Sequence, residues 1–461
     1  MAYGQSKAAR WPRRILLLLG VALALFGVVS FWPGRAPGVE VVPKLKGIGR
    51  RTPVEVKIDD VSRVKAVLVE VVQGADKIEV VEKEYTPGPT WAFWRSRKPE
   101  SFTVEVGKDT VKGLRAGEAT IRATAVRAGS LLRTPDPSVA EVKLPVRLSP
   151  PVLSLISTQH YTAQGGCEVV VYQVGESAVR DGVSAGAWWF PGFPLPGAPD
   201  VRTRFALFAV PYDHATAGDV RLVATDEVGN ESTQSFVDQF KPRPIHTDTI
   251  PLDDPFLSRV VPAILSQSPE VSDQGDLLKS YLEINRNLRK KNAETLKGLA
   301  KKSEAKFLWS EPFAPMANAK ITAAFADRRT YMYQDKPVDQ QDHLGFDMAS
   351  VERDAIRASN RGKVVLARYF GIYGNAVVID HGYGLMSLYG HLSSIGVQEG
   401  QMVERNQEIG RSGKTGLAGG DHLHFTLLLQ GLPVNPVEWW DAHWIRDRIV
   451  RKLGTGLPFT G

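Results

Sequence analysis

The sequence predicts a mainly β protein with an N-terminal transmembrane helix, two β-sandwich modules, a helical linker and a β-rich C-terminal domain. Three observations support this prediction. One apolar run lies near the N-terminus, short strand-like runs alternate with turn residues over most of the chain, and one segment after residue 240 has helical periodicity. A chain of 461 residues is long enough for about two to four domains.

The composition is that of a globular protein, with 43% hydrophobic and 23% charged residues. The net charge of +7 is modest for this length, and no basic stretch is interleaved with aromatic residues, so we expect no nucleic-acid partner. Cys167 is the single cysteine, which excludes an intrachain disulfide and suggests a small buried apolar residue.

The apolar run Ile15–Trp32 carries no charge and is long enough to span a bilayer as a helix. Four basic residues precede it: Lys7, Arg10, Arg13 and Arg14. They predict a cytoplasmic tail over 1–14, an anchor over 15–32 and export of everything that follows. A cleaved signal peptide is the alternative, but Phe31, Trp32 and Pro33 stand where small residues would mark a cleavage site. We therefore expect a single-pass protein of the cytoplasmic membrane, with its C-terminal domain on the periplasmic, extracytoplasmic side.

Two β-sandwich modules are predicted over 38–148 and 149–243. The strand Ala119–Val126 alternates with a period near two, as a half-buried antiparallel strand does. The segment Val223–Asn230 resembles the strand and turn near the end of bacterial immunoglobulin-like modules. Trp188–Pro199 is too rich in proline and glycine for a regular element, so a packed loop or an aromatic binding surface is expected there.

A helical linker is predicted over 254–302, because apolar residues recur at helical spacing from Asp276 to Ala300. The opposite face carries Arg286, Arg289, Lys290 and Lys291. A solvated helix face is the simplest interpretation of these charges, and a patch that binds the cell wall is the alternative. We expect this helix to act as a strut or a plug beside the C-terminal domain. That domain is predicted over 303–446, followed by a tail over 447–461.

Four of the histidines in the C-terminal domain are candidates for a site: His343, His391, His422 and His424. His343 and Asp347 form an H-x-x-x-D pattern, and His422 and His424 form an H-x-H pattern followed by the apolar run Phe425–Leu429. Residues two apart on a strand face the same side, so an H-x-H run directs both imidazoles to one point. Two imidazoles and one carboxylate are a common catalytic zinc set that leaves a position for water.

Four motifs in order resemble the lysostaphin-like M23 metallopeptidases, also called the LytM domain family. They are HLGFD at 343–347, GNAVVIDHGYGLMSLYGHLSS at 374–394, VQEGQMVERNQEIGRSGKTG at 397–416 and GDHLHF at 420–425. The resemblance implies that His343, Asp347 and His424 bind zinc, and that His391 and His422 are catalytic. Two positions depart from the family pattern: Ala326, where glycine is frequent, and Asp421, where proline is frequent.

The resemblance implies a hydrolase, a zinc-dependent peptidoglycan endopeptidase that cleaves cell-wall peptide cross-links with a metal-activated water. The chain has no H-E-x-x-H motif, so a histidine must handle the proton, and the division of that work between His391 and His422 stays open. Expected partners are the peptidoglycan peptide, the cytoplasmic membrane and an envelope protein bound through the β modules. The alternative is a non-catalytic envelope regulator or scaffold that activates another wall hydrolase.

Overall fold

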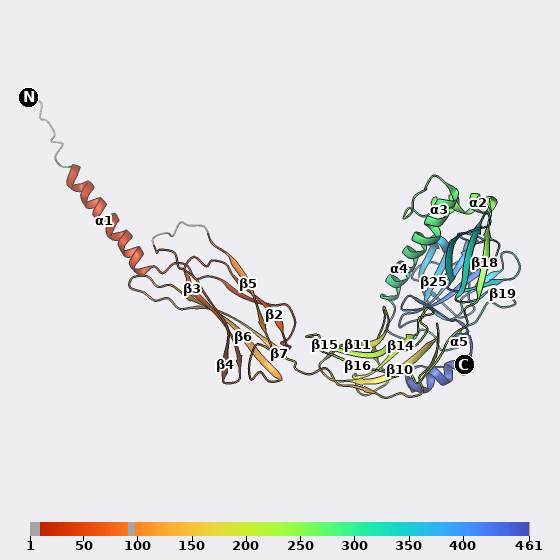
Figure 1. The fold of residues 1–461 in the computed structure, drawn as a ribbon, viewed down its shortest axis with the longest axis horizontal. Helices are drawn as coiled ribbons and strands as arrows, with labels where there is room; N and C mark the ends of the chain where they lie inside the picture. Colours follow the sequence, from red (N-terminus) through yellow and green to blue (C-terminus); the bar gives the residue numbers. More distant parts are fainter. Residues whose placement is uncertain (1–9, 91–96, 461) are drawn as a thin grey trace, which may run out of the picture. The chain divides into compact units, whose positions relative to one another are not determined.

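The computed structural model describes residues 10–90 and 97–460 and confirms a mostly β protein with an apolar helix near its N-terminal end (Figure 1). The chain divides into two compact units, Met1–Pro151 with Thr225–Glu231, and Val152–Ala224 with Ser232–Gly461. Helix α1 (Arg10–Phe31) contains an apolar stretch, Arg14–Phe31, long enough to cross a membrane, a test that a signal sequence also passes. Residues 1–9 of the predicted cytoplasmic tail lie outside the described residues.

The first module has two antiparallel sheets. One is β1 (Val39–Pro43), β2 (Thr52–Ile58) and β5 (Glu100–Val106), and the other has the order β4 (Asp76–Glu84), β3 (Val64–Gln73), β6 (Gly117–Arg127), β7 (Ser138–Val146). The predicted alternation in β6 is confirmed, because Ala119, Ile121, Ala123 and Ala125 are all buried. The immunoglobulin-like character of the β-sandwich modules stays a prediction.

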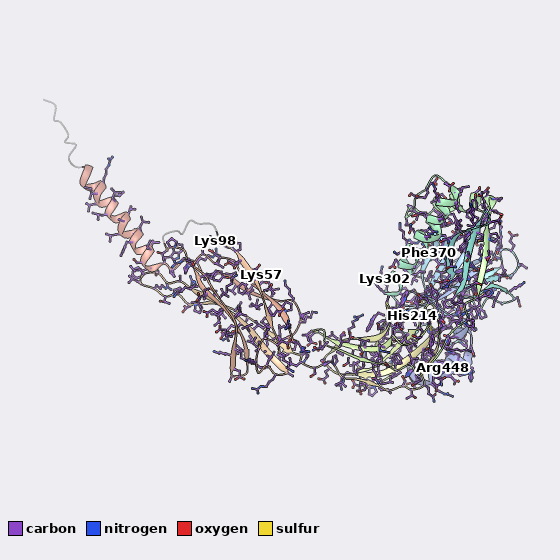
Figure 2. The ribbon with its side chains drawn as sticks, in the orientation of Figure 1. Lys57, Lys98, His214, Lys302, Phe370 and Arg448 are labelled. Atoms are coloured by element: carbon purple, nitrogen blue, oxygen red, sulfur yellow. The ribbon has the colours of Figure 1, made fainter. Side chains whose placement is uncertain are left out.

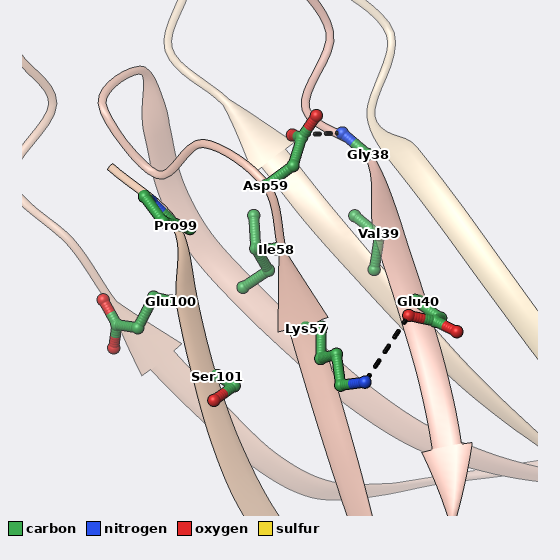
Figure 3. A pocket seen from close by; sticks show the side chains of 9 residues that line it. All are labelled: Gly38, Val39, Glu40, Lys57, Ile58, Asp59, Pro99, Glu100 and Ser101. Atoms are coloured by element: carbon green, nitrogen blue, oxygen red, sulfur yellow. Dashed lines mark hydrogen bonds and ion pairs between the residues drawn. The ribbon is translucent and has the colours of Figure 1, made fainter. Parts of the chain in front are cut away.

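A hollow in the first module lies beside β1, β2 and β5 (Figure 3). Lys57 lies 3.9 Å from Glu40 there, and the backbone N–H of Gly38 donates to Asp59 at 2.6 Å. An ion pair so exposed to water contributes about 0–1 kcal/mol at most, so these contacts indicate a solvated surface and not a built site.

The second module has two four-stranded sheets and a short parallel pair. The strands are β8 (Leu153–Leu155), β9 (Tyr161–Ala163), β10 (Cys167–Val174), β11 (Ala178–Ala185), β12 (Trp188–Pro191), β13 (Phe193–Pro194), β14 (Thr203–Ala209), β15 (Val220–Asp226), β16 (Glu231–Gln234) and β17 (Gln239–Lys241). The sheets have the orders β13-β14-β10-β8 and β12-β11-β15-β16, and β17 pairs with β9. Cys167 is buried, as predicted for a single cysteine that acts as a small apolar residue.

The prediction of no regular element over Trp188–Pro199 is wrong for its first part. Strand β12 pairs with β11, and β13 pairs with β14, each at the edge of its sheet. Edge strands tolerate proline because one side needs no ladder hydrogen bond. Phe190 is fully buried, which fixes this segment by packing.

The linker is helical as predicted, with α2 (Asp254–Leu265), α3 (Leu277–Glu283), a π-helical turn η2 (Ile284–Leu288) and α4 (Arg289–Ala300) (Figure 1). Asp253 and Asp276 cap α2 and α3 with their carboxylates, which satisfies N–H groups that lack helical partners. In α4, Leu296 and Ala300 pack into a buried cluster with Val378, Met386 and Leu388 of the C-terminal domain. The helix is therefore part of that domain's core.

The C-terminal domain is built on an eight-stranded sheet. It comprises β19 (Lys320–Ala323), β22 (Phe346–Ala349), β30 (Leu423–Leu429), β26 (Leu385–Leu392), β25 (Asn375–Asp380), β24 (Gly362–Tyr369) and β28 (Met402–Val403) in that order, with β31 (Leu432–Val434) paired to β30. A second sheet has the order β18 (Thr247–Leu252), β20 (Asp327–Tyr333), β21 (Lys336–His343). A third has the order β23 (Ala355–Arg357), β29 (Glu408–Arg411), β27 (Ser394–Ile395).

The second module and the C-terminal domain share one hydrophobic core. Phe205 of β14 lies 5.7 Å from the ring of Phe307 and 5.0 Å from that of Tyr383. The last segment contributes α5 (Val437–Trp440), α6 (Ala442–Ile445), a π-helical turn η4 (Arg446–Val450) and α7 (Arg451–Leu453). Within the predicted tail, Leu453 is buried and Arg448 lies 4.9 Å over the Tyr161 ring (Figure 2).

Candidate metal centre

Three strands bring His343, Asp347 and His424 to one place. His343 is the last residue of β21, Asp347 lies in β22, and His424 lies in β30. The antiparallel register of β22 and β30 sets Asp347 directly opposite His424. Directly opposite residues have Cβ atoms about 4.5–5.5 Å apart, so the register alone makes these two side chains neighbours.

The three side chains converge on one oxygen of Asp347. Oδ1 lies 3.0 Å from Nε2 of His343 and 2.9 Å from Nδ1 of His424, and those two nitrogens lie 3.1 Å apart. All three residues are buried. Among the described residues, this is the one group of histidine, cysteine and carboxylate side chains compact enough to hold a metal ion.

Hydrogen bonds at the far side of each ring fix the tautomers. Nδ1–H of His343 donates to the carbonyl of Ala324 at 3.0 Å, so Nε2 carries the lone pair. The Thr426 hydroxyl donates to the carbonyl of Leu344 at 2.9 Å and accepts from Nε2–H of His424 at 3.0 Å, which leaves the lone pair on Nδ1. Two lone pairs and a carboxylate oxygen therefore face each other, a donor set suited to a cation such as zinc.

His391 and His422 lie beside this group. Their rings are 4.8 Å apart, and the His391 ring is 5.7 Å from that of His424. Nδ1–H of His391 donates to the carbonyl of Thr415 at 2.7 Å, and Nδ1–H of His422 donates to that of Gly420 at 2.9 Å. Each ring therefore keeps Nε2 for chemistry, and Nε2 of His422 lies 3.5 Å from Asp347.

Burial and charge separate the protonation behaviour of these groups. Burial lowers the pKa of His391 well below its usual range and lowers the pKa of His424 to about 4. Burial opposes the charge of Asp347, but the neighbouring histidines outweigh it and lower the pKa of that carboxyl. Burial also opposes a charge on His422, yet Asp347 raises its pKa. Burial therefore favours the neutral form of His391, whereas Asp347 favours the protonated form of His422.

The second oxygen of Asp347 is held by an arginine that the motifs do not include. Nη2 of Arg329 in β20 donates to Oδ2 of Asp347 at 2.8 Å. Neither the sequence ADRRTY nor its spacing distinguishes Arg329 from Arg328, which instead pairs with Asp342 at 3.1 Å. Alternation along a strand predicts that the two arginines face opposite sides, but it does not predict which of them reaches Asp347.

The two departures from the family pattern have structural counterparts. Ala326 adopts a φ of 64°, in the left-handed region that favours glycine. Asp421 accepts from the hydroxyl of Ser412 at 2.5 Å and from the backbone N–H of Arg353 at 3.2 Å. These bonds hold the loop that precedes His422.

A cavity of about 710 Å³ contains the five predicted site residues. Its wall also includes side chains from β18, α2, α3 and α4, which sequence reasoning missed: Ile250, Leu252, Phe256, Arg259, Tyr281 and Arg289. Strand β18 reaches the site because it pairs in parallel with β20, across a sequence separation of about eighty residues for which no local motif exists.

His381 and His443 lie outside the cavity lining. His381 is fully buried, with Nδ1–H donating to the carbonyl of Arg361 at 2.8 Å and Nε2 lying 2.8 Å from the Ser387 hydroxyl. His443 lies in the terminal helical segment, with Nε2 3.4 Å from Asp447. Both are explained by local structure.

Comparison with known proteins places this centre in a family. The model of peptidase family M23 matches residues 341–436. The peptidoglycan DD-endopeptidase ShyA of Vibrio cholerae is 33% identical over 174 residues, which are 37% of this chain and 37% of that protein. The DD-carboxypeptidase/endopeptidase Mpg of Neisseria meningitidis is 42% identical over 95 residues, 21% of this chain and 22% of that protein. The murein hydrolase activator EnvC of Escherichia coli is 38% identical over 95 residues, 21% of this chain and 23% of that protein.

Solved structures superpose on this chain with low TM-scores. A crystal structure of a putative peptidase M23 from Pseudomonas aeruginosa has a TM-score of 0.37 at 20% identity, covering 62% of this chain and 96% of that one. At that score we draw no conclusion from the superposition. The family match covers the region that contains His343, Asp347, His391, His422 and His424. The C-terminal part of this chain is therefore a peptidase family M23 domain.

Proposed function

We propose that this protein is a zinc-dependent endopeptidase that hydrolyses peptide cross-links of peptidoglycan. The observation that carries the proposal is the convergence of His343, Asp347 and His424 on one point, with His391 and His422 beside it. The relatives named as peptidoglycan endopeptidases support the substrate class.

His343 through Nε2, His424 through Nδ1 and Asp347 through Oδ1 are the atoms that would hold the metal. Their tautomers are set by Ala324 and Thr426, so neither ring has to turn before binding. When bound there, zinc supplies a Lewis acid that polarises a peptide carbonyl and makes water more acidic.

The proton work falls to the two remaining histidines. His391 is neutral, with Nε2 unprotonated, so it accepts a proton from the attacking water. His422 would donate from Nε2–H to the oxyanion or the leaving amine, because its Nδ1–H is bound to Gly420 and its Nε2 faces the centre. The hydrogen bonds to Thr415 and Gly420 keep both rings oriented for these tasks.

Helix α1 supports attachment to the cytoplasmic membrane, with the M23 domain on the extracytoplasmic side next to the wall. We propose that the basic residues before the apolar stretch keep the N-terminus in the cytoplasm. The first module would then separate the catalytic unit from the anchor and offer a surface to an envelope protein.

The alternative is a regulator that activates another wall hydrolase, which the match to the activator EnvC favours. This chain carries a histidine or aspartate at each of the five positions of the site, and the structure brings them together. A regulator has no need for this set, so the enzyme is the better supported of the two functions.

The test uses the full chain purified in detergent, with zinc content measured alongside cleavage of cross-linked muropeptides. Asp347→Ala is the matched inactive variant, because it removes the oxygen on which the site converges. We expect about one zinc per chain and cleavage that Asp347→Ala abolishes. Absence of cleavage by the zinc-loaded chain, together with stimulation of a separate wall hydrolase that Asp347→Ala retains, would instead establish the regulator.

A further inference from the structure

The linker helix contributes a charged side chain to the candidate active site. Arg289, the first residue of α4, lines the same cavity as His343 and His424, yet it lies outside the part of the chain that matches peptidase family M23. The family match therefore assigns no role to Arg289. Tyr281, about two turns earlier on the same helical segment, lines the cavity with it.

The charge of Arg289 has no carboxylate to neutralise it. Three guanidinium groups line the cavity, those of Arg259, Arg289 and Arg329, and the last is paired with Asp347 at 2.8 Å. Nη2 of Arg259 donates to the carbonyls of Ala418 and Gly419, at 3.0 and 3.4 Å. These bonds stabilise the loop before His422. Over residues 10–90 and 97–460, no carboxylate oxygen lies within 4 Å of the guanidinium nitrogens of Arg289.

The acidic residues of the cavity wall are engaged with other partners. Asp253 caps α2 by accepting from the backbone N–H of Phe256 at 2.8 Å, and Asp248 accepts from that of Thr249 at 3.0 Å. Asp339, which is not part of the cavity lining, pairs with Arg286 at 2.9 Å. The positive charge of Arg289 is thus available to a ligand in the cavity.

A π-helical turn holds Arg289 in a fixed position. Its Nε donates to the backbone carbonyl of Asn285 at 3.1 Å, and its Nη2 donates to the side-chain Oδ1 of Asn285 at 2.6 Å. Asn285 is itself fully buried and donates from Nδ2 to Asp339 at 2.8 Å. These bonds leave the Nη1 donors unused and pre-order a side chain that would otherwise lose rotamer freedom on binding.

Arg289 and Tyr373 line the same cavity as the metal centre. The ring of Tyr373 lies 5.5 Å from the ring of His424. A peptide bound in this cavity therefore has both Arg289 and the candidate metal ligands in the wall around it.

We propose that Arg289 binds a free carboxylate of the peptide substrate and makes the enzyme selective for cross-links that carry one near the scissile bond. This inference rests on the proposed function for its substrate, and it names the chemical group that the site recognises. A guanidinium with unused donors at a partly buried position is the side chain best suited to a carboxylate.

Binding and cleavage are measured on the full chain in detergent with two probes. One is a cross-linked muropeptide with its free carboxylates, and the other is the same compound with those carboxylates converted to carboxamides. The variants are Arg289→Gln, Arg289→Lys and, as a matched control, Lys290→Gln, which removes the same charge from the neighbouring exposed position of α4. Thermal unfolding of each variant checks that the fold is intact.

The wild-type protein should bind the free carboxylate probe about 10- to 100-fold more tightly than the carboxamide probe. Arg289→Gln should remove this preference by weakening only the first probe, Arg289→Lys should restore part of it, and Lys290→Gln should leave it unchanged. Equal weakening of both probes by Arg289→Gln, or equal binding of both by the wild type, would overturn the inference. Since binding is read separately from cleavage, a protein that binds selectively but cleaves neither probe would refute the proposed hydrolysis and not the carboxylate site.

Discussion

Arg329 and Asp347 form a buried ion pair in which Nη2 of Arg329 lies 2.8 Å from Oδ2 of Asp347. The other oxygen, Oδ1, faces the nitrogens of His343 and His424. One oxygen of the carboxylate therefore binds Arg329, and the other is left to face the candidate metal centre. Because β20 carries Arg329 and pairs with both β18 and β21, the sheet that walls the cavity also orients the carboxylate.

Arg329→Met should weaken zinc binding. Without the guanidinium, the carboxylate can rotate away from the two imidazoles, and loss of such an outer partner costs about 10- to 100-fold in metal affinity or activity. Competition with a chromophoric chelator measures the affinity. Arg328→Met is the control, because Arg328 pairs with Asp342 instead. An equal effect of both substitutions would refute a specific role for Arg329.

Thr426→Val should also lower zinc affinity, with little change in stability. The valine keeps the shape of threonine but removes the acceptor for Nε2–H of His424, so the tautomer with its lone pair on Nδ1 loses its stabilising contact. The same chelator competition detects the change. Unaltered affinity would show that the tautomer of His424 is set by something else.

Leu296→Ala should destabilise the C-terminal unit by about 2–5 kcal/mol, because it opens a cavity between α4 and the main sheet. Denaturant unfolding followed by tryptophan fluorescence measures the loss, with the exposed Lys290→Ala as control. If Leu296→Ala left stability unchanged and accelerated cleavage, the helix would be a detachable plug and not a part of the core.

Glu438 should make stability fall as the pH rises toward 8. Burial, with a smaller contribution from Glu168, raises the pKa of this carboxyl to about 8, although it accepts from the Cys167 N–H at 2.7 Å. The folded state therefore holds a proton that the unfolded chain has released above pH 4.5, so the stabilisation is fully present below that pH and is lost as the pH rises through 8.

The comparison uses Glu438→Gln, which mimics the protonated carboxyl at every pH. Its unfolding temperature should depend less on pH between 6.5 and 8.5 than that of the wild type, since only the wild type has this proton to lose. Glu404→Gln, at an exposed carboxylate paired with Arg361, is the control. Parallel curves for the wild type and Glu438→Gln would contradict the shift.

The residues of the candidate centre could be predicted from the sequence, but the residues that surround the centre could not. H-x-x-x-D and H-x-H spacings are short-range patterns, and the ordered motifs around them led to five residues that the structure brings together. Arg329, Thr426 and Arg289 were missed for a physical reason. Their roles depend on strand register and on packing between segments far apart in the chain, and neither leaves a local pattern.

The fold shows the same division. The alternating strand β6 and the helix from Asp276 to Ala300 were predictable, because each buries one face with its own period. The edge strands β12 and β13 were not, since proline and glycine obscured a segment that Phe190 fixes through tertiary contacts. That the second module and the C-terminal domain share one core was likewise invisible in either segment alone.

The division of labour in the site is tested most directly by measuring bound zinc and turnover in parallel for His391→Ala and His424→Ala. Our account predicts that His424→Ala loses both zinc and activity, because it removes one of the three converging donors. His391→Ala should keep its zinc while kcat falls about 10²- to 10⁴-fold, the usual contribution of a general acid or base. Loss of zinc from His391→Ala as complete as from His424→Ala, or full activity in both variants, would contradict it.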